Sequence, residues 1–209
     1  RLVGSEMCIR DRLSVLEALA KPRSLTLHAA HFNHQLRGEE SQRDEDFVVQ
    51  WCQKRGIPLV VGRGDVAQEA QEQGKGVEET ARAMRYGFLT ATAQELGADK
   101  IATAHNADDN AETIIFNLCR GGGLGLGGIP PVRGNIIRPL LGCTRAEIEE
   151  YLRENSIPHV EDSSNESDAY SRNLIRHHVM PVLRSINPGA VLAAGRAARL
   201  LREDEECLE

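Results

Sequence analysis

Carboxylates and an imidazole gather between His105 and Thr113, in the segment HNADDNAET. Asp109 and Glu112 stand three residues apart, and Asp108 and Glu112 four apart, so a helix starting here would carry two or three carboxylates on one face. Such a cluster could hold Mg²⁺ beside ATP phosphates, with Asp109 as a ligand, or receive the ammonium group of an amine substrate. His105 could donate a hydrogen bond to a phosphate or a base. Helix dipoles attract acids to helix amino termini in any case, which accounts for one or two of these carboxylates but not for His105.

A second cluster of polar residues lies at the end of the apolar run 24–32, in HFNHQLRG. His31, Asn33, His34 and Arg37 are expected at the end of a strand, which is where parallel sheets bind ligands. Taken alone, this pattern is weak. A metal site made of His28, His31 and His34 is disfavoured, because alternation along a strand would separate the first two from the third.

Two arginine pairs could contact phosphate groups. Arg82 and Arg85 lie within one helical turn and could fork onto phosphate oxygens, although a surface ion pair with Glu78 or Glu79 is the plainer interpretation. Arg172 and Arg176 are spaced i, i+4 and could straddle a nucleic-acid backbone, with polar contacts from Asn165 and Asn173. A structural clamp to Asp162 is the alternative for either arginine.

The elements that must position these groups alternate between strand and helix. This alternation predicts an α/β fold with a doubly wound, mainly parallel sheet. In the helix expected over 77–96, the apolar residues Val77, Ala81, Met84, Phe88 and Ala91 predict the packed face. The glycine-rich stretch from Gly121 to Pro131 predicts a mobile loop. The remaining expected strands are 24–32, 57–61 and 100–104, and the remaining expected helices are 41–54, 111–119, 144–155 with a capping box from Thr144 to Glu147, and one after Pro188.

Composition narrows the class of protein. The chain has 209 residues, of which 41% are hydrophobic and 27% charged, as expected for one globular domain with a short piece of another. No apolar run approaches the roughly 20 residues needed to cross a bilayer, so a cytoplasmic protein without a membrane partner is expected.

The five cysteines include no CxxC pair, which disfavours a metal knuckle. The net charge is -6, yet 119–146 and 170–202 contain arginines and no acid. These stretches could form a local anion-binding face, and ordinary solvated helix faces are the alternative.

The ordered motif series, taken as a whole, resembles the tRNA(Ile)-lysidine synthetases of the N-type ATP-pyrophosphatase family. The resemblance runs from about Leu13 to Asn187 and is highly specific as a set, although no single motif decides it. Its motifs are HFNHQLRG, EETARAMRY, TAHNADDNAET, LCRGGGLGLGGI, RPLL and EDSSNESDAYSRNLIR.

The resemblance implies a two-step reaction on the wobble cytidine of a tRNA(Ile) with a CAU anticodon. ATP would adenylate the C2 oxygen of the base, and free L-lysine would then attack C2 and release AMP. Asp109 and Glu112 would lie near the nucleotide and the lysine amine, and His105 and Arg85 would contact phosphates or the activated base. One carboxylate could accept the lysine proton. ATP or substrate contacts are further implied for His31, Asn33, His34, Arg37, Arg82, Asp108 and Arg120, and tRNA contacts for Asn165, Arg172, Asn173 and Arg176.

The chain departs from this family at its amino terminus. The SGGxDS loop, whose backbone N–H groups would wrap the pyrophosphate of ATP, is absent from the sequence, and VGSEMCIRDR stands in its place. We therefore interpret residues 1–12 as a foreign segment, 13–187 as an incomplete ATP-pyrophosphatase domain, and 188–209 as a helix leading to an absent tRNA-binding region. The chain is expected to bind ATP poorly.

Two alternative functions and the state of association stay open at this stage. A tRNA 2-thiocytidine synthetase shares the fold but is disfavoured by the absence of CxxC. A nucleotide- or RNA-binding module without catalytic activity is favoured by the missing loop. A homodimer is one alternative for the state of association.

Grafting a strand and an SGGxDS loop ahead of Ser14 tests the interpretation of the amino terminus. We expect ATP-dependent lysine incorporation into tRNA to rise above that of the unaltered chain, because the graft restores backbone donors for the pyrophosphate. Incorporation is measured with labelled lysine. No gain over the unaltered chain would contradict the interpretation.

Overall fold

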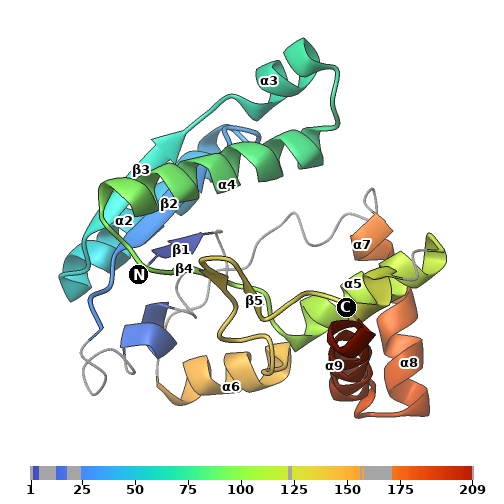
Figure 1. Cartoon of the computed structure of the whole chain (residues 1–209). Helices are drawn as coiled ribbons and strands as arrows, with labels where there is room; N and C mark the ends of the chain where they lie inside the picture. The colour runs from blue at the N-terminus through green and yellow to red at the C-terminus, as the bar shows by residue number, and fades with distance from the viewer. Residues whose placement is uncertain are drawn as a thin grey trace. The chain divides into compact units, whose positions relative to one another are not determined.

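The computed structural model describes residues 2–4, 13–17, 25–121, 124–155, 157 and 171–208, and the chain divides into two compact units (Figure 1). Unit 1 comprises Arg1–Ala104 with Gly134–Ile137, and unit 2 comprises His105–Arg133 with Arg138–Glu209. Each unit is described by itself. No helix in the described ranges is both long and apolar enough to span a membrane.

Unit 1 is built on parallel strands. Strand β2 pairs with β3, β1 pairs with β4, and β4 pairs with β6, all in parallel, while β1 also contacts β2. The predicted parallel α/β class is confirmed. Strand β1 was not expected, since it lies in the segment that the sequence indicated to be foreign. The strands are β1 (Leu2–Gly4), β2 (Ala29–Asn33), β3 (Leu59–Arg63), β4 (Ile101–Thr103) and β6 (Ile136–Ile137).

Three helices of unit 1 begin and end at residues whose chemistry explains the boundary. Helix α2 (Glu39–Arg55) has acids in its first turn and bases in its last, as the helix dipole favours, and ends at Gly56 in the left-handed conformation, with φ of 64°. Helix α3 (Val66–Gln73) is capped by Asp65, which accepts a hydrogen bond from the Gln68 backbone. Helix α4 (Val77–Glu95) contacts β2, as does α2.

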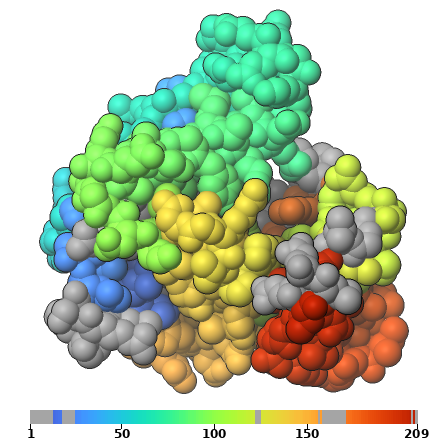
Figure 2. Space-filling model, in the orientation of Figure 1, coloured from blue at the N-terminus to red at the C-terminus, as the bar shows by residue number. Residues whose placement is uncertain are grey.

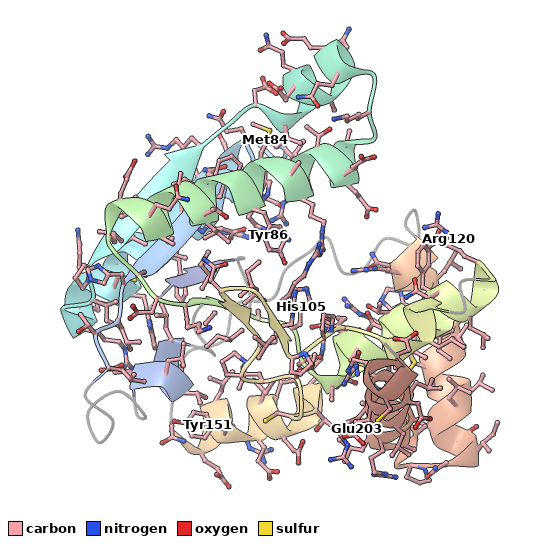
Figure 3. All side chains as sticks on the ribbon, viewed as in Figure 1. Met84, Tyr86, His105, Arg120, Tyr151 and Glu203 are labelled. Atoms are coloured by element: carbon pink, nitrogen blue, oxygen red, sulfur yellow. The ribbon has the colours of Figure 1, made fainter. Side chains whose placement is uncertain are left out.

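The packed face of α4 differs from the predicted one. Val77 is 42% exposed and Ala91 is exposed, whereas Thr80 and Thr92 are buried. The prediction was wrong for Val77 and Ala91, and it missed the two threonines because it counted only apolar residues, whereas Phe88 packs against the core as expected. The core of unit 1 accordingly joins Leu89 and Ala93 of α4 to Ala30 and Ile101 of the strands. Met84 and Tyr86 project from different sides of α4 (Figure 3).

Unit 2 is mainly helical. Its core joins Ala107, Ala111, Ile175, Met180 and Val191, and the surfaces of α8 and α9 lie side by side (Figure 2). Thr144 and Glu147 form the predicted capping box of α6. The elements are α5 (Ala107–Cys119), η2 (Leu124–Gly127), β5 (Val132–Arg133), α6 (Arg145–Glu154), α7 (Ser171–Leu174), the π-helical turn η4 (Ile175–Val179), α8 (Met180–Ile186) and α9 (Ala190–Leu208).

The glycine-rich stretch is more ordered than its composition predicted. Residues 124–127 form the 3₁₀ turn η2, and side-chain amides of α5 bind the backbone around it. Asn117 donates to the Gly125 carbonyl oxygen at 2.8 Å, and Asn110 accepts from the Ile129 backbone at 2.7 Å. In the described part the stretch therefore does form a short element, against expectation, and two asparagines satisfy some of its backbone groups. Its predicted mobility stays a prediction.

The corrected face of α4 predicts which substitutions weaken unit 1. Leu89→Ala should lower the free energy of unfolding by about 2–5 kcal/mol, since Leu89 is 1% exposed and its removal leaves a cavity. Val77→Ala, on the same helix but exposed, should change it by less than about 0.5 kcal/mol. Urea unfolding followed by circular dichroism measures both, and equal losses would contradict the burial pattern.

Candidate functional site

The carboxyl ends of β2 and β3 form a polar edge in unit 1. Asn33 and Arg63 are paired in the register of the two strands, and both bind the carboxylate of Glu45 on α2. Asn33 Nδ2 lies 2.9 Å from Glu45 Oε2, and Arg63 Nε lies 3.0 Å from the same oxygen. The second oxygen, Oε1, accepts from Arg63 Nη2. Glu45 therefore joins two adjacent strand ends at the side of a parallel sheet where ligands bind.

The pKa of Glu45 is lowered to about 2, chiefly by the hydrogen bonds from Arg63. Burial opposes this shift, while the Asn33 amide and the nearby His31 favour it. Because the folded pKa lies below the ordinary value of 4.5, the stabilisation from this group is complete above pH 4.5 and is lost as the pH falls toward 2. Glu45 is thus a charged, buried acceptor at neutral pH.

Four of the predicted binding residues lie in strand β2 or directly after it, where β2 ends at this polar edge: His31, Asn33, His34 and Arg37. His31 and Asn33 are buried in β2, and the ring of His34 lies edge-on to Phe32 with centroids 5.1 Å apart. Arg37 Nη2 lies 3.4 Å from Asp44 Oδ2 on α2. The roles of His31 and His34 as substrate contacts stay predictions.

Arg82 and Arg85 share an aromatic partner on α4. The guanidinium carbon of Arg82 lies 5.0 Å from the ring centre of Tyr86, and that of Arg85 lies 5.7 Å away. Arg82 is exposed and Arg85 half-buried. Stacking on a ring leaves the edge of a guanidinium able to donate to phosphate oxygens, so the predicted phosphate contacts are compatible with this arrangement.

The start of α5 in unit 2 is organised by a capping box that sequence analysis did not single out. Asn106 Oδ1 accepts from the Asp109 backbone and Asp109 Oδ2 accepts from the Asn106 backbone, each at 2.9 Å. His105, half-buried, directly precedes this cap (Figure 3). The Asp109 carboxylate therefore has one oxygen committed to the helix start, which fixes its orientation.

Asp108 does not share the face of the other two acids. Its Oδ2 accepts from the Arg145 backbone at 2.7 Å, and its Oδ1 accepts from Arg184 of α8. These contacts tie α5 to the start of α6 and to α8. Of the two or three carboxylates expected on one face, Asp109 and Glu112 lie together, whereas Asp108 contacts tertiary partners that its spacing from Glu112 does not reveal.

Glu112 and Asp109 instead meet the guanidinium of Arg176, which lies in η4. Arg176 and Glu112 form a bidentate ion pair, with Nε 2.7 Å from Oε1 and Nη2 2.9 Å from Oε2. Arg176 Nη2 also lies 3.6 Å from Asp109 Oδ1. The Glu112 side chain is only 5% exposed and that of Arg176 22% exposed. This ion pair neutralises a carboxylate that would otherwise be costly to bury.

Burial raises the pKa of Asp109, and the neighbouring charge of Glu112 acts in the same direction. The hydrogen bond from Asn106 and the charges of Arg145 and Arg176 oppose the shift. A carboxylate with a raised pKa accepts a proton more readily at neutral pH than an ordinary aspartate does.

Magnesium does not fit the carboxylates as they are arranged. Both oxygens of Glu112 are bound by Arg176, and one oxygen of Asp109 caps α5. A cation with near-octahedral demands would have to displace the guanidinium. Over the described ranges, no group of three or more His, Cys, Asp or Glu side chains is placed to hold a metal ion. Asp109 as a Mg²⁺ ligand stays a prediction.

The remaining predicted residues fall into three situations. Arg120 follows α5 and is exposed, with its guanidinium carbon 5.3 Å from the ring centre of Phe116. Arg172 is exposed and Asn173 half-buried in α7. Asn165, with Asp162, lies outside the described residues. Arg176 was expected to face tRNA, and in the structure it contacts Glu112, so a tRNA contact requires that it serve both partners.

Sequence reasoning missed four residues that shape these sites, and the signals differ. Asn106 could have been found, because an asparagine three residues before an acid at a helix start is a capping pattern. Glu45, Arg63 and Arg184 gave no such signal, since their partners are distant in sequence.

Comparison with known proteins defines the class. The model of the PP-loop domain family matches residues 11–183, so this chain belongs to the PP-loop family. Membership of this family implies ATP as a ligand.

Curated relatives of the chain carry a common name. Three proteins called tRNA(Ile)-lysidine synthase are similar to it: that of Thermotoga maritima is 43% identical over 177 residues, that of Bacteroides thetaiotaomicron 48% over 161, and that of Geobacter sulfurreducens 40% over 203. These alignments cover 84%, 77% and 95% of this chain, but only 42%, 38% and 43% of the relatives. The chain thus spans about two fifths of the length of the curated relatives it matches.

A solved structure supports the fold. The chain is similar to a U34-tRNA thiolase, NcsA, from Methanococcus maripaludis, solved with its [4Fe-4S] cluster, with a TM-score of 0.74 and 18% sequence identity. The match covers 97% of this chain and 71% of the thiolase. At this identity the likeness establishes the fold alone.

The pairing of Glu112 with Arg176 predicts a stability difference between two neighbouring arginines. Arg176→Gln should lower the free energy of unfolding by about 3–5 kcal/mol, because it leaves the buried Glu112 carboxylate without its cation. Arg172→Gln, at an exposed position, should change it by less than about 0.5 kcal/mol. Urea unfolding distinguishes the two variants, and a small loss for Arg176→Gln would mean that the ion pair is not formed in solution.

Proposed function

We propose that this chain carries the nucleotide-activating part of a tRNA(Ile)-lysidine synthase. The observation that carries the proposal is the identity of 40–48% to proteins of that name across most of the chain. The substrates would be ATP, free L-lysine and a tRNA(Ile) with a CAU anticodon. The wobble cytidine O2 would attack the α-phosphate of ATP and release pyrophosphate, and the lysine amine would then attack C2 and release AMP.

The acids of α5 suit the second step. An ammonium group needs anions to position it, and Glu112 and Asp109 supply two carboxylates beside one another. The amine must lose a proton before it attacks, and the raised pKa of Asp109 suits that carboxylate to accept it. Arg176 already occupies this pair, so the lysine ammonium would share or replace the guanidinium.

Cationic side chains suit the first step, in which negative charge moves onto pyrophosphate and AMP. In unit 1, Arg85 and Arg82 of α4 and Arg37 before α2 are the guanidiniums proposed to contact phosphate groups. In unit 2, His105 is the residue proposed to donate to a phosphate or to the activated base. Arg120 would add a further contact. His31, Asn33 and His34 would line the strand edge, and Asp108 would act by holding α5 in place.

The tRNA would contact the arginine-rich part of unit 2. Arg172 is exposed, and the stretch 170–202 that contains it has no acidic residue. Asn173 and Asn165 would add polar contacts. A cytoplasmic location and a homodimer belong to the proposal as expectations. Mg²⁺ at Asp109 would have to displace the guanidinium of Arg176, so no chemical step is assigned to the metal.

The direct test is lysidine formation. The unaltered chain and the chain carrying the SGGxDS graft are incubated with ATP, lysine and a tRNA(Ile) transcript with a CAU anticodon, and the nucleosides are analysed by mass spectrometry. We expect lysidine at the wobble position, at a higher level with the graft, and none on the same transcript carrying uridine at that position. Absence of lysidine from both chains would contradict the proposal.

Binding measurements identify the rival. Isothermal titration with ATP, and separately with the tRNA, separates a catalytic domain from an RNA-binding module. Binding of tRNA without ATP by the grafted chain would favour the module. A thiolase is tested by repeating the incubation with sulfide in place of lysine, and a thiolated nucleoside in that mass spectrum would point to a thiolase instead.

A further inference from the structure

The end of β2 turns into α2 through a short loop whose shape depends on one amide. Asn33 Oδ1 accepts from the Gln35 backbone at 2.9 Å, and Gln35 has a φ of 55°, in the left-handed region that residues other than glycine adopt at a cost. The loop then places Arg37, whose backbone donates to Ser41 Oγ at 3.2 Å. The Asn33 side chain thus stabilises the strained residue at which the loop begins.

Glu45 determines which way the Asn33 amide is turned. An ionised carboxylate only accepts hydrogen bonds, so the Asn33 NH₂ group must face it, at 2.9 Å, and the amide oxygen is left to face Gln35. The same NH₂ group also donates to the Ser41 carbonyl oxygen at 3.2 Å. A neutral side chain of the same shape could present either a donor or an acceptor, and would not fix this orientation.

Glu45 is held in the ionised state by Arg63 and lies beneath the surface. It is 3% exposed, and Arg63 reaches it from the end of the neighbouring strand. Its position in the second turn of α2, within the acidic run 39–46, gives no sign of this in the sequence. A chain of contacts therefore runs from Arg63 through Glu45 and Asn33 to Gln35, and so to the loop that carries His34 and Arg37.

We propose that Glu45 is a positioning residue, which orients Asn33 and thereby sets the shape of the loop 34–38 for substrate binding. The substrate part of this inference rests on the proposed function. Glu45 does not itself touch a substrate. Its effect is expected in the affinity for ATP rather than in the rate of the chemical step, since it shapes a binding loop that contains no proposed proton acceptor.

The test compares Glu45→Gln with Glu72→Gln, which makes the same chemical change at an exposed position of α3. The first readout is hydrogen exchange of the Gln35 amide by NMR, referenced to the Ala29 amide, which bonds to the Pro58 carbonyl oxygen in the strand region. We expect exchange at Gln35 to be faster by about three- to tenfold relative to that reference in Glu45→Gln, and unchanged in Glu72→Gln, because one hydrogen bond is weakened.

The second readout is lysidine formation by the grafted chain carrying each substitution. Glu45→Gln should raise the KM for ATP by about three- to tenfold with kcat within about twofold, and Glu72→Gln should change neither. A merely structural role would lower the amount of active protein, and so kcat, without changing KM.

The outcomes separate this inference from the proposed function. An unchanged Gln35 amide in Glu45→Gln overturns the positioning role, whatever the activity. Faster exchange with no lysidine from the parent chain leaves the positioning of the loop supported and overturns the proposed function with its ATP arm. If Glu45→Gln does not fold, Arg63→Gln is measured instead, since it removes the two donated hydrogen bonds that hold the Glu45 carboxylate beside Asn33. The same amide should then exchange faster, and an unchanged rate again overturns the inference.

Discussion

A buried carboxylate must be paired with a cation or with several hydrogen-bond donors, and this constraint applies in both units of the chain. In unit 1, Glu45 is satisfied by Asn33 and Arg63, so two strand ends are joined to α2. In unit 2, Glu112 is satisfied by Arg176, which links α5 to the π-helical turn η4. Each buried acid thereby fixes the position of an element that carries proposed substrate contacts.

Local chemistry was predictable from the sequence wherever the interacting residues are near one another along the chain. The parallel α/β class, the strand before His105, the helix after it and the Thr144 to Glu147 capping box follow from periodicity and from short-range hydrogen bonding. The face of α4 was predicted incorrectly in part, because Thr80 and Thr92 are buried although only apolar residues were counted, while Val77 is left exposed.

Tertiary partners were beyond the reach of the sequence. Arg176 was interpreted as a tRNA contact because its spacing from Arg172 suits a phosphate backbone, and nothing in the pattern indicates an acid 64 residues away. Asp108 was grouped with Asp109 and Glu112 by helical spacing, yet it binds the start of α6 and Arg184. Periodicity gives the direction in which a side chain leaves a helix, but not the element that it meets.

The central claim is that Arg176 and Glu112 act as one unit at the proposed lysine site. A double-mutant cycle on Glu112→Gln and Arg176→Gln, measured by urea unfolding, isolates the energy of their pairing from the effects of each substitution alone. We expect a coupling energy of about 1.5 kcal/mol or more. The double variant should therefore lose less free energy of unfolding than the two single variants lose in sum. A coupling near zero would show that the two side chains act independently, and would contradict the account.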